Sequence, residues 1–147
     1  MRFGQNQIEF VAQAVAAVDK LFPTFAAAWS DPHFKVAFNA YSTKNFNAEN
    51  TQFLLAVEGG EKADVLRTKF IGEGADLQIN ISMDQRNKLL GQGEYEAEDP
   101  SEDFADAVKE ITNLVARDTY PRFRKASEYN AWAVNYAFAN VKPFSNM

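Results

Sequence analysis

The chain has 147 residues, which suits one domain with a single hydrophobic core. Hydrophobic residues make up 46% of it and include 13 Phe, so the composition excludes global disorder. A formal net charge of -5 argues against nucleic acid as a partner, because phosphate binding needs a basic face. The absence of Cys excludes disulfides, cysteine metal sites and thiol nucleophiles. We expect no signal peptide and no intrinsic membrane segment, because no apolar stretch approaches about 18 residues.

The N-terminal part is predicted to be helical. In residues 8–21 the large apolar side chains recur at steps of three and four, which places them on one helical face. These residues are Ile8, Val11, Val15, Val18 and Leu21. We expect them to be buried, with Asp19 facing solvent and the helix ending before Pro23. A short helix should follow, and Asp31 is positioned to cap a third helix that begins at Pro32.

Two further helices are predicted in the next part of the chain. A turn over residues 42–47 leads into a helix over residues 48–58, which Asn47 can cap and Gly59 can end. Residues 62–71 have the apolar spacing of another helix.

Residues 75–82 alternate between apolar and polar side chains, but no partner strand for a sheet is visible. We therefore expect an extended loop that presents Asn80 outward. The apolar side chains that should anchor it are Leu77, Ile79 and Ile81. Ser82 and Gln85 have the spacing of a capping box, which predicts a short helix after the loop.

The C-terminal part begins with an acidic surface loop over residues 91–100. Ser101 can cap the long helix that follows. The apolar face expected to be buried on this helix contains Phe104, Val108, Ile111, Leu114 and Val115. Pro121 cannot lie deep inside a continuing helix, so a new helix should start near Asp118, and a last helix should carry Trp132 on its buried face. The sequence therefore predicts an all-α fold.

Most patterns that would indicate an active site are absent. His33 is the one histidine, whereas a zinc site needs three or four ligands, so we expect an exposed residue and no metal. The chain has no glycine-rich phosphate loop of the common types, and no cofactor is expected. A small hydrolase that uses Glu49 or Glu58 stays open as an alternative, since carboxylates can pair across a cleft.

Three segments carry a resemblance to a known family. These segments are FKVAFNAYSTKNFNAENTQFLLAVE, LQINISMDQRNKLL and ITNLVARDTYPRFRKASEY. In this order they resemble the regulator of G-protein signalling (RGS) domain, over about residues 22–129. The resemblance implies a bundle of about nine helices that forms a single domain over residues 1–147, with N- and C-terminal helices flanking the core.

The resemblance also implies a function that does not make the chain an enzyme. RGS domains bind the transition-state form of a Gα subunit and accelerate its GTP hydrolysis without a catalytic residue of their own. By matched position the residues expected to bind Gα are Glu49, Asn50, Asn80, Leu114, Asp118 and Arg122. Asn80 would approach the partner's water-orienting glutamine, and Arg122 would hold Asp118 in place. A cytoplasmic location, with recruitment to a membrane through a partner, goes with this function.

Some residues depart from the family pattern. Leu54 stands where an aromatic residue is usual, and Asn45 and Phe46 replace an acidic residue and a tyrosine. Because Asn45 and Phe46 are expected near the contact surface, these changes bear on partner choice. The alternative function is an RGS-fold interaction module without GTPase-activating activity.

Overall fold

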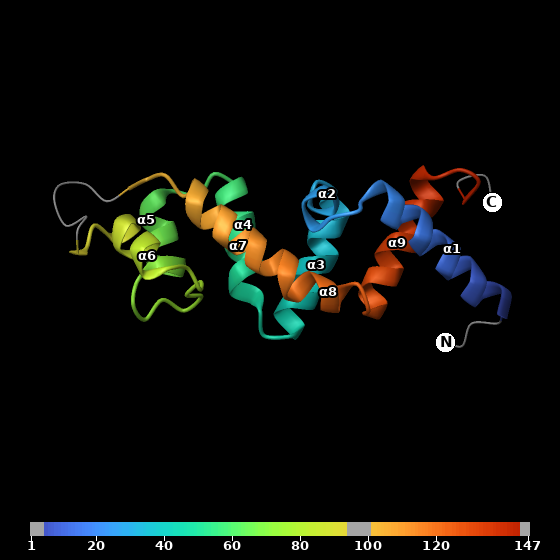
Figure 1. Ribbon diagram of the computed structural model, residues 1–147, viewed down its shortest axis with the longest axis horizontal. Helices are drawn as coiled ribbons and strands as arrows, with labels where there is room; N and C mark the ends of the chain where they lie inside the picture. Colours follow the sequence, from blue (N-terminus) through green and yellow to red (C-terminus); the bar gives the residue numbers. More distant parts are fainter. Residues whose placement is uncertain (1–4, 94–100, 145–147) are drawn as a thin grey trace. The chain divides into compact units, whose positions relative to one another are not determined.

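The computed structural model describes residues 5–93 and 101–144 (Figure 1). These residues form helices and no strand, which confirms the all-α prediction, and the labelled helices run from α1 to α9. Most of the predicted acidic loop, residues 94–100, lies outside the described part of the chain. The chain divides into a first unit, Met1–Tyr41 with Tyr120–Met147, and a second unit, Ser42–Thr119.

The first unit is built around aromatic side chains. Its helices are α1 (Gln5–Leu21), α2 (Phe25–Trp29), α9 (Ser127–Asn140), and the parts of α3 (Pro32–Lys44) and α8 (Thr119–Phe123) that fall inside it. α1 packs along α9 (Figure 1). Phe34 is fully buried, and its ring centroid lies 4.9 Å from that of Trp132 and 5.6 Å from that of Phe123. The α3 cap is confirmed, because the Phe34 N–H donates to Asp31 Oδ2 at 2.9 Å.

The prediction for the buried face of α1 was wrong at both ends. Ile8 and Leu21 are each 53% exposed, whereas the side chains enclosed against the unit are Ala14 and Val18. The prediction considered only the spacing of large apolar residues. It therefore missed the burial of Ala14, whose small side chain allows close packing. Asp19 does not simply face solvent either, since it binds side chains from the C-terminal part of the same unit.

The second unit contains the loop and helices that carry most of the predicted site. Its elements are α4 (Ala48–Glu58), α5 (Ala63–Leu66), the π-helix η1 (Arg67–Ile71), α6 (Met83–Leu90) and α7 (Ala105–Arg117). α4 packs on α7 and on α5, and η1 packs on α6. Phe53 and Phe70 are fully buried and lie 5.5 Å apart between ring centroids.

Several predicted helix boundaries in the second unit shift by a few residues. α3 continues to Lys44 into the predicted turn, and the helix predicted over residues 62–71 changes to a π-helix, with the Gly72 N–H donating to the Arg67 carbonyl at 2.8 Å. α7 begins at Ala105, whose N–H is capped by Asp103 Oδ1 at 2.9 Å and not by Ser101. The start of α7 differs because the side chains of Ser101 and Asp103 can both accept from free backbone amides near it.

No helix within residues 5–93 and 101–144 is both long and apolar enough to cross a membrane.

Candidate functional site

The structure places the predicted site residues on four elements. Glu49 and Asn50 lie in the first turn of α4, Asn80 lies between η1 and α6, and Leu114 lies on α7. Asp118 ends α7, and all five belong to the second unit. Arg122 lies on α8 in the first unit.

Exposure separates these residues into three groups. The exposed ones are Asn80, Asp118 and Arg122. Glu49 and Leu114 are half-buried, and Asn50 is buried. Three of the six side chains are therefore exposed on the unit to which they belong.

The segment before α6 presents Asn80 as the sequence predicted. Ile79 and Ile81 are 1% and 7% exposed, and Asn80 between them is exposed. The Ile79 N–H donates to the Phe70 carbonyl at 2.9 Å, and the Leu77 N–H donates in the same way to η1. Carbonyls in the last turn of a helix lack partners within that helix, so the returning segment satisfies them and is fixed by them.

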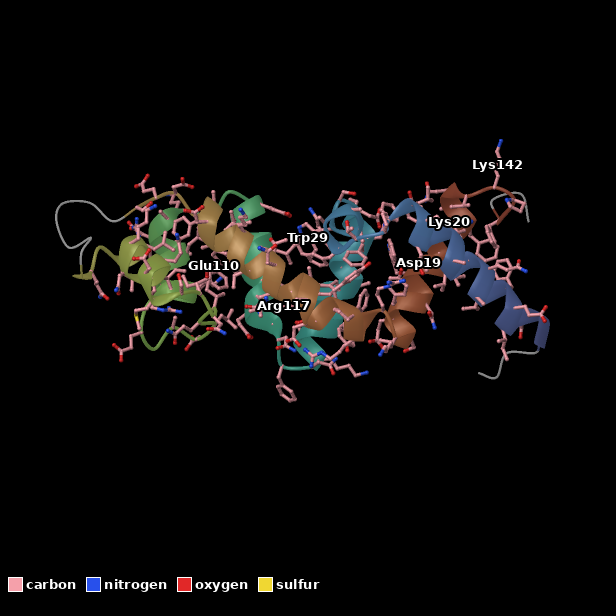
Figure 2. All side chains as sticks on the ribbon, viewed as in Figure 1. Asp19, Lys20, Trp29, Glu110, Arg117 and Lys142 are labelled. Atoms are coloured by element: carbon pink, nitrogen blue, oxygen red, sulfur yellow. The ribbon has the colours of Figure 1, made fainter. Side chains whose placement is uncertain are left out.

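Two charged side chains complete the attachment of this segment, which runs over residues 72–82. Arg86, on α6, donates through Nη1 to the Ile71 carbonyl and through Nη2 to the Ile79 carbonyl at 2.6 Å. Glu110, on α7 (Figure 2), accepts the Ser82 N–H at 2.9 Å and the Ser82 hydroxyl at 3.1 Å. Hydrogen bonds with one ionised partner are among the stronger ones in proteins. The backbone around Asn80 is thus held by α6, α7 and η1 together.

The attachment at Glu110 puts the segment on a particular side of α7. Leu114 follows Glu110 by four residues, so the two side chains are neighbours on one helical face. Asp118 follows by four more residues, and its N–H donates to the Leu114 carbonyl at 2.9 Å. The Asn80 segment is therefore tied to the same side of α7 that carries Leu114.

Asn50 differs from the other predicted contact residues. It is 7% exposed, and its Oδ1 is enclosed and accepts no hydrogen bond from any described residue. A buried acceptor without a partner costs about 1–3 kcal/mol. Its neighbour Thr51 is also buried but satisfied, because its hydroxyl donates to Ser42 Oγ at 2.9 Å. The Oδ1 of Asn50 could meet a partner only after the amide or its surroundings move.

The hydrolase alternative loses its geometric basis. Glu49 and Glu58 lie on the same helix, nine residues apart. At about 3.6 residues per turn they project from opposite faces of α4, so they cannot flank one bond as a catalytic pair. Among the described residues, no group of three His, Asp or Glu side chains could hold a metal ion.

Arg86 and Glu110 are the residues that the sequence did not indicate. In a complete capping box the Gln85 side chain would accept the Ser82 N–H. The Ser82 hydroxyl does accept the Gln85 N–H at 3.2 Å, but the Ser82 N–H donates to Glu110. The one sequence signal for this contact was Ser82 at the start of α6. Its backbone N–H needs a hydrogen-bond acceptor, but the sequence does not identify which residue supplies it.

Comparison with known proteins identifies the family of the chain. A family model described as the regulator of G protein signaling domain matches residues 24–132. The chain is 32% identical over 115 residues to Regulator of G-protein signaling 1 of Xenopus tropicalis, covering 71% of this chain and 56% of that protein. It is 31% identical over 103 residues to Regulator of G-protein signaling 21 of Homo sapiens, covering 63% of this chain and 66% of that protein.

A second frog protein is similar to this chain to about the same extent. Regulator of G-protein signaling 1 of Xenopus laevis is 33% identical over 118 residues, covering 74% of this chain and 57% of that protein. The chain thus spans a little over half the length of the two frog relatives. The family match covers more than half of the chain and includes all six predicted site residues. The chain belongs to the regulator of G protein signaling domain family.

Proposed function

We propose that this chain is a GTPase-activating protein for a Gα subunit of the heterotrimeric type. It would bind the switch regions in the arrangement of the hydrolysis transition state and supply no catalytic residue. Family membership supports a role in regulating G-protein signalling. The observation that carries the proposal of GTPase activation is the setting of Asn80. Its exposed amide lies on a segment whose backbone is bound on both sides to three helical elements, α6, α7 and η1.

Such a protein would accelerate hydrolysis by differential binding. An interaction that is stronger in the transition state than in the ground state lowers the barrier, whichever molecule supplies the reacting groups. An amide can donate and accept hydrogen bonds without adding net charge. It therefore suits a site that already contains phosphate, magnesium and a polarised water.

The proposed contacts lie in several segments. Asn80 would meet the partner's glutamine and switch threonine, and Asp118 would accept hydrogen bonds from the first switch segment. Arg122 would hold the Asp118 carboxylate, a pairing that stays a prediction. Leu114 would add an apolar contact. Glu49 would lie at the edge of the proposed Gα contact surface, and Asn50 would lie beside it.

We propose further that residues 1–147 act as one domain. The family match over residues 24–132 runs through both units, which supports a joint role for them. A cytoplasmic location, with a partner as the route to a membrane, goes with a Gα target.

A second candidate is an interaction module with the RGS fold and no GTPase-activating activity. The enclosed Oδ1 of Asn50 favours it, because that atom is not accessible to a partner in the observed arrangement. The replacements at Asn45 and Phe46 point the same way, since they alter the expected contact surface.

Single-turnover GTP hydrolysis by a panel of Gα subunits, with and without the chain, decides between the two. The first proposal expects faster hydrolysis by at least one Gα and tighter binding to Gα with GDP and aluminium fluoride than with GDP alone. Binding without faster hydrolysis would support the interaction module. Neither binding nor acceleration across the panel would contradict the first proposal and leave an interaction module whose partner is not a Gα subunit.

A further inference from the structure

Two charged side chains outside the proposed contact set hold the backbone on both sides of Asn80. Arg86 Nη2 donates to the Ile79 carbonyl at 2.6 Å, one residue before Asn80. Glu110 accepts both donors of Ser82, two residues after it. Arg86 and Glu110 are both half-buried, and they come from different helices, α6 and α7.

We propose that Arg86 and Glu110 are positioning residues for the Asn80 contact. They hold residues 79–82 in the conformation that presents Asn80, so that the amide meets its partner without a prior ordering step. This inference rests on the proposed function, in which Asn80 touches the transition-state form of Gα.

The chemistry of each side chain fits this role. The Arg86 guanidinium is a rigid fork, and it reaches two carbonyls, those of Ile71 and Ile79, at the two ends of residues 72–78. The Glu110 carboxylate has two acceptor oxygens, and each takes one Ser82 donor. A contact that is already ordered avoids the entropic cost of ordering a loop on binding.

Apolar burial by itself leaves this conformation incompletely specified. The side chains of Ile79 and Ile81 are enclosed, which fixes the face of the segment that points inward. Hydrophobic burial has no direction, whereas a hydrogen bond to a backbone carbonyl fixes the orientation of the peptide unit. The peptide between Ile79 and Asn80 carries the carbonyl that Arg86 binds, so Arg86 fixes the backbone from which the Asn80 side chain departs.

The second unit offers a matched control in Arg67. Its side chain is 15% exposed, and it also donates to two carbonyls, that of Leu89 at 2.9 Å and that of Ser101 at 3.1 Å. Neither carbonyl lies in residues 72–82. Arg67 also forms an ion pair with Asp64. Replacing Arg67 therefore removes two comparable carbonyl contacts and this ion pair from the same unit without releasing the Asn80 segment.

The first experiment measures binding to Gα with GDP and aluminium fluoride. Arg86→Gln should weaken binding by about tenfold to a hundredfold, since it removes charged hydrogen bonds from the segment. Arg86→Lys should restore part of the loss, because one ammonium cannot reproduce the two-pronged contact. Arg67→Gln should change affinity by less than about threefold at a similar cost in thermal stability.

A double-mutant cycle separates positioning from a general structural role. If Arg86 acts through Asn80, then Arg86→Gln should have little further effect on affinity in an Asn80→Ala background. Fully additive losses would overturn the inference. If Arg86→Gln does not fold, the same cycle can be run with Glu110→Gln. Glu110 is a half-buried residue of α7 that holds the segment at Ser82.

Hydrogen exchange tests the positioning without any Gα. Arg86→Gln should speed exchange of the Ile79 N–H, and Glu110→Gln should speed exchange of the Ser82 N–H, while Arg67→Gln should leave both nearly unchanged. Unchanged exchange in the first two variants would overturn the inference even if the chain activates a Gα. Faster exchange in a chain that engages no Gα would instead show that the proposed function fails while the attachment of the segment is real.

Discussion

The Tyr129 hydroxyl donates a hydrogen bond to Asp19 Oδ1, which joins α9 to α1 within the first unit. Asp19 lies on α1 (Figure 2). The other oxygen of Asp19 accepts a bond from Arg124 Nη2 at 2.7 Å. Burial raises the pKa of Tyr129 above its ordinary value of 10.0, and the hydrogen bond to Asp19 raises it further. The cluster therefore favours the neutral phenol of Tyr129.

This cluster predicts a loss of stability in alkaline solution. Above pH 10.0 the unfolded chain loses the Tyr129 proton while the folded chain keeps it, so the stabilisation is full below that pH and falls as pH rises further. Urea unfolding between neutral pH and pH values above 10.0 should show a shallower decline for Tyr129→Phe than for the parent. Part of the decline should remain, because burial also raises the pKa of Tyr120. Tyr136→Phe, on the same helix, serves as control, and an equally steep decline in Tyr129→Phe would refute the assignment.

Asn80→Ala should keep the fold and lose activity. The side chain is exposed, so thermal stability should change by less than about 0.5 kcal/mol. Acceleration of single-turnover GTP hydrolysis should fall by about a hundredfold, the order seen when one preorganised donor leaves a transition-state site. Gln78→Ala removes an exposed amide from the same segment and should have little effect on hydrolysis. Full activity of Asn80→Ala would count against the proposed contact.

Asp118→Ala should discriminate between states of the partner. Because the proposed role is to bind a switch segment in its transition-state arrangement, affinity for Gα with GDP and aluminium fluoride should drop by about tenfold or more, with little change for Gα with GDP. Isothermal titration with both forms measures the difference. Asp106→Ala removes the same charge from the first turn of α7 and is the control. Equal losses for both forms would indicate simple docking.

Asn50→Leu should separate stability from function. Replacing an unsatisfied buried amide by an apolar group of similar size should leave the unfolding free energy unchanged or raise it by about 1 kcal/mol. Thr51→Val is the contrasting control, because it removes a satisfied bond to buried Ser42 and should cost about 1–3 kcal/mol. GTPase activation by Asn50→Leu should fall if the amide meets Gα. Retained activation would assign Asn50 to the interior and support its exclusion from the contact set.

Phe46 combines two features that do not favour folding. It is 92% exposed, and its φ of 61° is in the left-handed region that bulky side chains rarely adopt. Phe46→Asn should raise the unfolding free energy by about 1 kcal/mol, since Asn tolerates this conformation. If Phe46 contacts the partner, the same change should weaken Gα binding. A variant that gains stability and binds every tested Gα as tightly as the parent would exclude that contact.

Much of the local structure followed from neighbouring residues. Asp31 and Pro32 predicted where α3 begins, and Pro121 predicted the break between α7 and α8. The alternation around Asn80 predicted the burial of Ile79 and Ile81 and the exposure of Asn80, whereas Leu77, predicted as a third anchor, is only half-buried. These features depend on backbone preferences and hydrophobic period within a few residues, so the sequence carries enough information to predict them.

Other features needed partners from distant parts of the chain. Ser82 binds Glu110, which lies 28 residues further along, and no local rule selects that acceptor over Gln85. The enclosure of Asn50, on a helix that packs against α7, likewise was not indicated by its neighbours in the sequence.

The sequence by itself determined the helical class, most helix positions, the family and the exposure of Asn80, because these depend on local pattern. Only the tertiary structure decided what holds Asn80 in place and which face of α1 is covered. Those outcomes depend on which of several chemically suitable groups arrive at the same point when distant segments pack together. The type of each residue fixes which donors and acceptors it has, but the tertiary packing determines which of these groups form hydrogen bonds with one another.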